Sequence, residues 1–266
     1  MTAPHQLPPV VATDLDGTLI RSDGTVSERS RRALAAAENA GALVVLVTGR
    51  PPRWMSSVVE QTGHRGLAVC ANGALVYDLH TESVIEEHLI EPEIATEVVR
   101  ALRDAMPGLT FAVERGPRGF AHEPSYRPAW DTDDKLVAEL DAILHEPMAK
   151  LLARHRELDP DTLLSHARDI VGELATLTHS SRDGLLEISA AGVSKASTLE
   201  LLCHERGRAA ADVIAFGDMP NDVPMLSWAG WAVAVANAHP TVIAVVDEIT
   251  ASNDDDGVAA VLERWV

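Results

Sequence analysis

Short apolar runs alternate with amphipathic helical stretches along the N-terminal part of the chain, and this alternation constrains the fold more than any other feature. Apolar runs at 10–13, 42–47 and 67–70 are separated by helix patterns at about 27–40 and after Pro51-Pro52. The second run is continuous and rich in β-branched residues, which is typical of a parallel strand buried on both faces. Strand and helix in this order predict a parallel sheet with helices on both faces.

The same alternation of short apolar runs and helical stretches returns near the C-terminus. We expect helices and strands, in chain order, at 197–206, 213–216, 221–227, 231–235 and 257–265. Ser27 and Gly41 stand where a helix N-cap and a helix end are expected, and Gly207 ends the first C-terminal helix.

The middle of the chain has a different pattern. Pro92 and Asp133-Asp134 are expected to open two helices, and less regular strands are expected at 109–114, 148–152 and 175–178. The segment 115–130 concentrates Pro, Gly and charged residues, which indicates a loop or hairpin. We therefore predict an α/β protein whose Rossmann-like parallel-sheet core, residues 1–81 and 191–266, carries an inserted α+β cap, residues 82–190.

Charge and composition limit the partners. The formal net charge of −18 argues against nucleic acid or an anionic membrane surface, because both are polyanions. No secretion signal or membrane-spanning run is recognised, so a cytoplasmic location is expected. Cys70 and Cys203 form no CxxC motif and are expected to be buried apolar residues in a reducing compartment.

The segment Asp14-Leu15-Asp16-Gly17-Thr18-Leu19 directly follows the first apolar run. It sets two carboxylates at the carboxyl end of a strand, where open α/β sheets keep their sites, and such close like charges require a cation or a proton between them. A solvated turn or one arm of a calcium loop are the alternatives. The calcium loop is disfavoured because Thr18 and Thr25 stand where it would carry an Asp or Asn and a Glu.

Three further segments stand at strand or helix ends. Thr48, in Thr48-Gly49-Arg50, has a hydroxyl suited to a phosphoryl oxygen, although such turns are common. Lys195 precedes a predicted helix, and by itself it would be an ordinary solvated lysine. The segment 217–222 carries Asp218, Asn221 and Asp222, for which an acidic helix N-terminus is the plain alternative.

In order and context, the four segments resemble the haloacid dehalogenase-like superfamily of phosphatases, whose signature is DxDGT, a Thr or Ser after the second strand, a Lys, and GDxxND. The position of the insertion and the turn at 71–74 resemble the Cof-type branch, subclass IIB, as do the segments 236–238 and 256–258. The resemblance covers essentially the whole chain, strongly in the core and loosely in the cap.

The resemblance implies roles for the core residues. Asp14 would be the nucleophile that becomes an aspartyl phosphate, and Asp16 would be the general acid and then the base. Mg²⁺ would be bound by the Asp14 carboxylate, the Asp16 carbonyl and the Asp218 carboxylate. The remaining residues would act around them: Thr48, Lys195 and Asn221 on the phosphoryl group, and Asp222 on metal-bound water and on Lys195.

The roles of four other residues are left open. Arg50 either caps the site or pairs with an acid. Arg115, Arg118 and His122 either face the substrate or lie in a solvated loop, and the solvated loop is preferred. The acids at 254–256 are expected to precede and cap the last helix rather than to bind a metal.

The function that follows is a Mg²⁺-dependent phosphatase acting on a small phosphorylated metabolite, such as a sugar phosphate, a phosphorylated cofactor or a nucleotide. A phosphomannomutase-like phosphotransferase and a non-catalytic phospholigand-binding regulator are the alternatives. The sequence indicates neither the metabolite nor the oligomeric state.

Overall fold

The computed structural model describes residues 4–128, 135–181 and 183–266, and the chain divides into two compact units. Unit 1 comprises Met1–Arg50, Trp54–Glu86 and Ser194–Val266. Unit 2 comprises Pro51–Arg53 and Glu87–Val193. In sequence, unit 2 therefore interrupts unit 1. That residues 82–190 serve as a cap for substrate selection stays a prediction.

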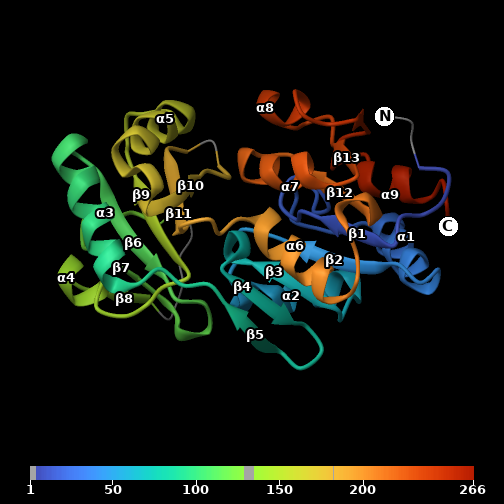
Figure 1. The fold of residues 1–266 in the computed structure, drawn as a ribbon, viewed down its shortest axis with the longest axis horizontal. Helices are drawn as coiled ribbons and strands as arrows, with labels where there is room; N and C mark the ends of the chain where they lie inside the picture. Colours follow the sequence, from blue (N-terminus) through green and yellow to red (C-terminus); the bar gives the residue numbers. More distant parts are fainter. Residues whose placement is uncertain (1–3, 129–134, 182) are drawn as a thin grey trace. The chain divides into compact units, whose positions relative to one another are not determined.

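Unit 1 is built on an eight-stranded sheet in the order β14-β13-β12-β1-β2-β3-β4-β5. Its strands are β1 (Val10–Thr13), β2 (Leu43–Val47), β3 (Leu67–Cys70), β4 (Leu75–Asp78), β5 (Ser83–Glu87), β12 (Val213–Gly217), β13 (Trp231–Ala234) and β14 (Glu248–Ile249). Strands β14 to β3 are parallel to their neighbours, and β4 pairs antiparallel with β3. Figure 1 shows β1 beside β2, and β12, from the other end of the chain, is the second neighbour of β1. Strand β1 is thus a central strand, and residues that follow it lie between those that follow β2 and β12.

Helices pack against this sheet through apolar side chains. They are α1 (Glu28–Asn39), α2 (Met55–Thr62), α6 (Lys195–Glu205), α7 (Val223–Trp228), α8 (Pro240–Ile243) and α9 (Gly257–Leu262). Ser27 caps α1 by accepting a hydrogen bond from the Ser30 N–H, as its position predicts. Leu199 and Leu202 of α6 pack in one buried cluster with Val45 and Val47 of β2. This packing fixes α6, and with it Lys195, against the sheet.

Unit 2 is a six-stranded sheet in the order β10-β11-β9-β6-β7-β8, antiparallel except for the pair β7 and β8. Its strands are β6 (Thr110–Glu114), β7 (Phe120–His122), β8 (Lys135–Val137), β9 (Lys150–Arg154), β10 (Ala175–Thr178) and β11 (Leu185–Ala190). Its helices are α3 (Pro92–Ala105), α4 (Leu140–Ile143) and α5 (Pro160–Val171). One face of the sheet packs in a large apolar cluster with these helices. The alternate residues of β6, β9 and β11 include the charged Glu114, Lys150, Arg154 and Glu187 beside a small apolar cluster, as the period of two along a strand allows.

The predicted α/β fold with a parallel-sheet core is confirmed, and three local predictions in unit 2 need correction. Asp133-Asp134, expected to open a helix, lie outside the described residues, and the residues that follow form strand β8. The second long helix is instead α5, which Asp159 caps by accepting from the Thr162 N–H. The strand expected at 148–152 lies two residues later, and β11 was not expected at all.

Two further observations concern the buried cysteines and possible membrane-spanning helices. Cys70 and Cys203 are both buried, as expected. Across the ranges described above, no helix has the length and apolar character needed to cross a bilayer.

Candidate active site

The carboxyl end of β1 carries Asp14 into the interior of unit 1. The Asp14 N–H continues the sheet by donating to the Phe216 carbonyl of β12, at 3.0 Å. Its carboxylate is buried, whereas that of Asp16, two residues on, is exposed. The two acids of the motif therefore have different environments, which two different chemical roles require.

Lys195 supplies the positive charge of the site. It is the first residue of α6, which begins two residues earlier than the helix predicted from the sequence, and Ser194 is its N-cap. The Lys195 ammonium is fully buried and donates to Oδ1 of Asp14 and to Oδ1 of Asp222, both at 2.6 Å. Burial alone would lower the pKa of Lys195, but the charges of Asp14 and Asp222 more than offset it and raise that pKa above its usual range. Lys195 is thus a fixed cation, not the solvated lysine that its sequence context alone suggests.

The Asp222 carboxylate accepts three hydrogen bonds, two of them from the loop after β12. Its Oδ2 accepts from the backbone N–H groups of Asp218 and Met219, both at 3.0 Å, and its Oδ1 binds Lys195. Gly217 permits this loop, because a Cβ there would lie 2.6 Å from the Cβ of Asp222. Asp222 therefore orients the loop and Lys195.

Asp218 points toward the turn that follows β1. Its Oδ1 accepts from the Thr18 hydroxyl at 3.0 Å. Gly17 approaches Oδ2 so closely that a Cβ would lie 2.4 Å from it, and Gly17 has a left-handed φ of +80°. The glycine and the threonine of the motif are therefore required by the Asp218 carboxylate, which the sequence reasoning did not anticipate.

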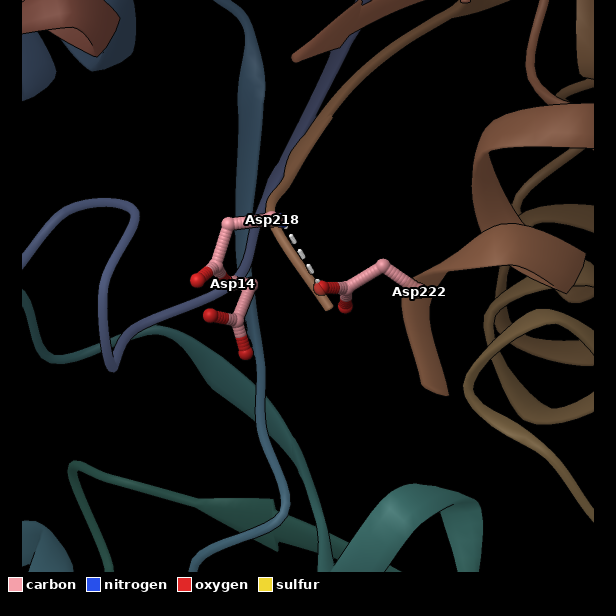
Figure 2. A group of neighbouring side chains, drawn as sticks. All are labelled: Asp14, Asp218 and Asp222. Carbon is pink, nitrogen blue, oxygen red and sulfur yellow. Dashed lines mark hydrogen bonds between the residues drawn. The ribbon is translucent and has the colours of Figure 1, made fainter. Parts of the chain in front are cut away.

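Asp14, Asp218 and Asp222 each offer a carboxylate oxygen within 4.8 Å of the others (Figure 2). Burial raises the pKa of Asp14 well above its usual range, and Lys195 only partly counters this. Burial, together with the charge of Asp222, raises the pKa of Asp218 to about 7. The protein thus holds more negative charge here than Lys195 balances, which is the condition that a bound cation relieves.

The residues fit a hard divalent cation. All the candidate ligands are oxygens, the kind that Mg²⁺ and Ca²⁺ prefer. Since Asp222 already has both oxygens engaged, Asp14 and Asp218 are the two carboxylates with capacity left for a metal. This is the pair expected from the sequence.

Thr48 and Asn221 lie beside this cluster in the fold. Thr48 follows β2, and its hydroxyl accepts from the Arg50 N–H at 3.0 Å. Asn221, in the single 3₁₀ turn Pro220–Asp222, donates from Nδ2 to Oδ1 of Asn72 at 3.0 Å. Both side chains are buried.

Arg50 pairs with an acid, and that acid is Asp16. Its Nε and Nη2 donate to the two carboxylate oxygens of Asp16 at 2.8 and 2.5 Å. The bidentate geometry holds the Asp16 carboxylate in one orientation, although its exposure to solvent keeps the strength of the pair modest.

The three residues considered in the cap have different surroundings. Arg118 is exposed, as the solvated-loop reading expects. Arg115 and His122 are buried, so that reading is wrong for them. Arg115 donates to the Ile143 carbonyl at 2.7 Å, and His122 Nδ1 contacts the Glu123 carbonyl at 2.8 Å beside the rings of Phe120 and Tyr126. Arg115 and His122 therefore each make a buried contact with a backbone carbonyl.

The sequence reasoning missed a buried ion pair in unit 2, between Lys150 of β9 and Glu187 of β11, at 2.5 Å. The alternation Lys-Leu-Leu-Ala-Arg in β9 was the available indication, since the second face of a sheet in that pattern carries charge.

The acids at 254–256 also act differently from expectation. Asp256 is the N-cap residue of α9, but its carboxylate binds Arg21 at 2.7 Å and makes no side-chain hydrogen bond to the helix.

A family model described as haloacid dehalogenase-like hydrolase matches residues 11–262. The chain belongs to this family. Curated relatives of this haloacid dehalogenase-like hydrolase include the 5-amino-6-(5-phospho-D-ribitylamino)uracil phosphatase YitU of Bacillus subtilis, 29% identical over 97% of both chains. The pyridoxal phosphate phosphatase YbhA of Escherichia coli is 28% identical and covers 94% of this chain and 96% of its own. The relatives are named as phosphatases, so the predicted class of enzyme is confirmed.

Solved structures support the fold. A haloacid dehalogenase-like hydrolase from Bacillus subtilis superposes with a TM-score of 0.82 at 24% identity, over 97% of this chain and all of the other. At this identity the likeness extends to the fold, and the residue roles rest on the geometry above.

Removing one acid from the cluster tests its electrostatics. Because the folded-state pKa of Asp218 lies above the unfolded value, this group costs stability that grows as the pH rises from about 4 to 7. Asp218→Asn keeps the acceptor for Thr18 and removes the charge, so at pH 8 without metal it should unfold at a higher temperature than the parent. One pKa unit corresponds to about 1.4 kcal/mol, so the expected gain is on the order of 1–4 kcal/mol. Thermal unfolding in EDTA measures it, and the gain should shrink as the pH is lowered to 5. A variant less stable than the parent at pH 8 would refute this electrostatic picture.

Proposed function

We propose that this haloacid dehalogenase-like hydrolase is a Mg²⁺-dependent phosphatase that hydrolyses monoesters of small phosphorylated metabolites through an aspartyl phosphate on Asp14. The observation that carries the proposal is the contact of a buried carboxylate, Asp14, with a buried lysine at the carboxyl end of a central strand. Asp218 lies next to them with a carboxylate able to hold a cation. A nucleophile, a fixed positive charge and a cation site in one place are the parts that phosphoryl transfer needs.

In the first half of the reaction an oxygen of the Asp14 carboxylate attacks phosphorus, and the bond from phosphorus to the ester oxygen breaks. Asp16 gives its proton to that departing oxygen. Arg50 must release Asp16 for this step, because both carboxylate oxygens of Asp16 are engaged by the guanidinium.

In the second half Asp16, now ionised, takes a proton from a water molecule. The water oxygen forms the new bond to phosphorus, and the bond to Asp14 breaks, which releases inorganic phosphate and regenerates the carboxylate. Asp16 serves both halves, as proton donor and then as proton acceptor. Its exposed side chain gives it access to water.

The surrounding residues hold the transferred group. Lys195 is fixed by Asp14 and Asp222 and supplies positive charge to the phosphoryl oxygens without any rearrangement. Thr48 and Asn221 offer a hydroxyl and an amide as further hydrogen-bond donors. Mg²⁺, held by the Asp14 and Asp218 carboxylates and the Asp16 carbonyl, supplies positive charge against the substrate's negative charge. This accounts for an acidic protein that acts on an anion.

The substrate class follows from the relatives, which are named for a ribitylaminouracil phosphate and for pyridoxal phosphate. We propose that the present chain acts on a phosphorylated metabolite of this size in the cytoplasm, with residues 82–190 as the selecting cap. His122 is the cap candidate that we retain, because its Nε2 is buried and has no hydrogen-bond partner within the residues described.

Hydrolysis of a simple aryl phosphate tests the proposed function. The purified protein should release inorganic phosphate from p-nitrophenyl phosphate with Mg²⁺, and EDTA should lower that rate at least about tenfold because the buried acids then lose their counter-charge. Added Mg²⁺ should restore the rate, and Ca²⁺ should restore it poorly, since its longer and looser coordination misplaces the nucleophile.

The same assay separates the alternatives. A mutase would need a bisphosphorylated activator before any turnover, and a binding regulator would release no phosphate at all. Full activity after exhaustive dialysis against EDTA would exclude the metal site.

A further inference from the structure

The 3₁₀ turn Ala71–Gly73, between β3 and β4, has an unusual backbone. Ala71, Asn72 and Gly73 have φ values of 51°, 58° and 103°, so all three are left-handed in succession. A non-glycine residue in this region is strained and persists only where its surroundings fix it. Two such residues in sequence therefore point to a turn whose shape serves something else.

The turn's backbone braces the loop after β2. The Asn72 N–H donates to the Thr48 carbonyl at 3.0 Å, and the Ala71 N–H donates to the Arg50 carbonyl at 2.9 Å. Thr48 is a proposed phosphate-binding residue, and Arg50 holds the proposed acid–base residue. A shift of the turn would move both.

The turn is also wedged against the start of α6. A Cβ on Gly73 would lie 2.2 Å from the Ser194 carbonyl oxygen, so only glycine fits there. The Gly73 carbonyl accepts from the Thr198 hydroxyl at 2.7 Å. These contacts lie directly beside Lys195, the first residue of that helix.

The Asn72 side chain makes the third connection, to Asn221. Asn221 Nδ2 donates to Asn72 Oδ1 at 3.0 Å, and the two residues are only 5% and 2% exposed. Asn72 Nδ2 and Asn221 Oδ1 have no hydrogen-bond partner anywhere in the described part of the chain. If both side-chain amides were rotated by 180°, so that nitrogen and oxygen changed places, one amide nitrogen and one amide oxygen would still have no partner. A buried polar atom without a partner destabilises the fold, so its presence needs an explanation, and a bound ligand that satisfies it is one.

We propose that Asn72 is a positioning residue of the phosphoryl-binding site. Its backbone fixes Thr48, its side chain fixes Asn221, and the amide pair keeps one N–H donor for a phosphoryl oxygen of the substrate. Phosphoryl oxygens accept hydrogen bonds, so the ligand class is a phosphate monoester or inorganic phosphate. This inference rests on the proposed phosphatase function, and it assigns a role to a turn that the four signature segments leave out.

Asn72→Gly separates a positioning role from a merely structural one. Glycine adopts the left-handed backbone without strain, so the turn should form and the variant should fold, even though Asn221 Nδ2 loses its acceptor. With p-nitrophenyl phosphate and Mg²⁺, kcat should nevertheless fall by about 10- to 100-fold, the usual effect of losing a residue that orients a site, with KM changed far less. Glu82→Gly is the matched control, because Glu82 is also left-handed at φ 52° but is exposed on another turn. It should leave kcat and KM unchanged.

Asn72→Asp tests the donor itself. This variant keeps the shape and the acceptor for Asn221, but its ionised carboxylate has no N–H to donate. It should lose activity as Asn72→Gly does, and inorganic phosphate should no longer raise its unfolding temperature as it does for the parent. If the glycine variant fails to fold, this second variant decides.

Unchanged kcat in a folded Asn72→Gly, or in Asn72→Asp with its response to phosphate intact, would reduce Asn72 to a turn residue and overturn the proposal. Failure of the proposed function would be seen separately, as absence of phosphate release from the unmodified protein.

Discussion

Lys195→Met is expected to lower kcat/KM for p-nitrophenyl phosphate by about 10²–10³-fold, because it removes a preorganised positive charge from a buried site. Methionine fills the space of the aliphatic stem without an ammonium. The substitution leaves Asp14 and Asp222 facing each other in the interior without the cation that both now contact. Breaking a buried pair in this way costs about 3–5 kcal/mol, so the unfolding temperature in EDTA should also fall.

A second substitution separates the two effects of Lys195→Met. In the double variant Lys195→Met with Asp222→Asn, a neutral amide replaces one of the two carboxylates that have lost their cation. Stability should therefore partly recover while activity stays low. Lys135→Met, in strand β8 of unit 2, is the control for loss of a lysine elsewhere and should keep the parent's kinetics. Activity within about twofold of the parent in Lys195→Met would contradict its placement at the phosphoryl group.

Asp16→Ala is expected to lower steady-state turnover of p-nitrophenyl phosphate by about 10²–10⁴-fold, the usual weight of general acid–base catalysis. The aryl oxide leaves without a proton, so the attack by Asp14 should still proceed. Hydrolysis of the aspartyl phosphate needs the base in every case. Stopped-flow absorbance should therefore record a burst of about one product per active site, followed by a very slow phase.

A poor leaving group extends this test. With a sugar phosphate the alkoxide needs the proton that Asp16 gives, so the variant should lose the burst as well as the turnover. Steady turnover of both substrates at the parent's rate would show that the Asp16 side chain is neither the acid nor the base. Asp16 would then keep only the proposed contact of its backbone carbonyl with the metal.

The sequence predicted the core well because its strands are local and nearly continuous in apolar residues. Val10–Thr13 and Leu67–Cys70 have the predicted bounds, since each is a buried run with a clear break at its end. In unit 2 the strands are mostly antiparallel and amphipathic, so charged residues such as Lys150 belong to a strand and blur its pattern. Asp159 and Pro160 mark the start of helix α5, as an N-cap and a proline in the first turn, so the sequence does carry an indication of this helix.

The candidate site could be predicted as far as the order of the parallel strands could be predicted. Residues at the carboxyl ends of neighbouring parallel strands must meet, so Asp14, Thr48 and Asp218 could be grouped from the sequence. Contacts that depend on side-chain direction could not. The pairing of Arg50 with Asp16 and the burial of His122 follow from tertiary packing, which no local pattern encodes.

The most direct test of the central claim is to locate the phosphoryl group on the protein. Asp16→Ala, mixed with p-nitrophenyl phosphate and Mg²⁺ and quenched in acid during the slow phase, should carry one phosphoryl group, and peptide mapping by mass spectrometry should find it on Asp14. Asp14→Asn treated in the same way should carry none and show no burst, because an amide does not act as the nucleophile. A burst from Asp16→Ala without phosphate on Asp14, or steady turnover by Asp14→Asn, would contradict the account.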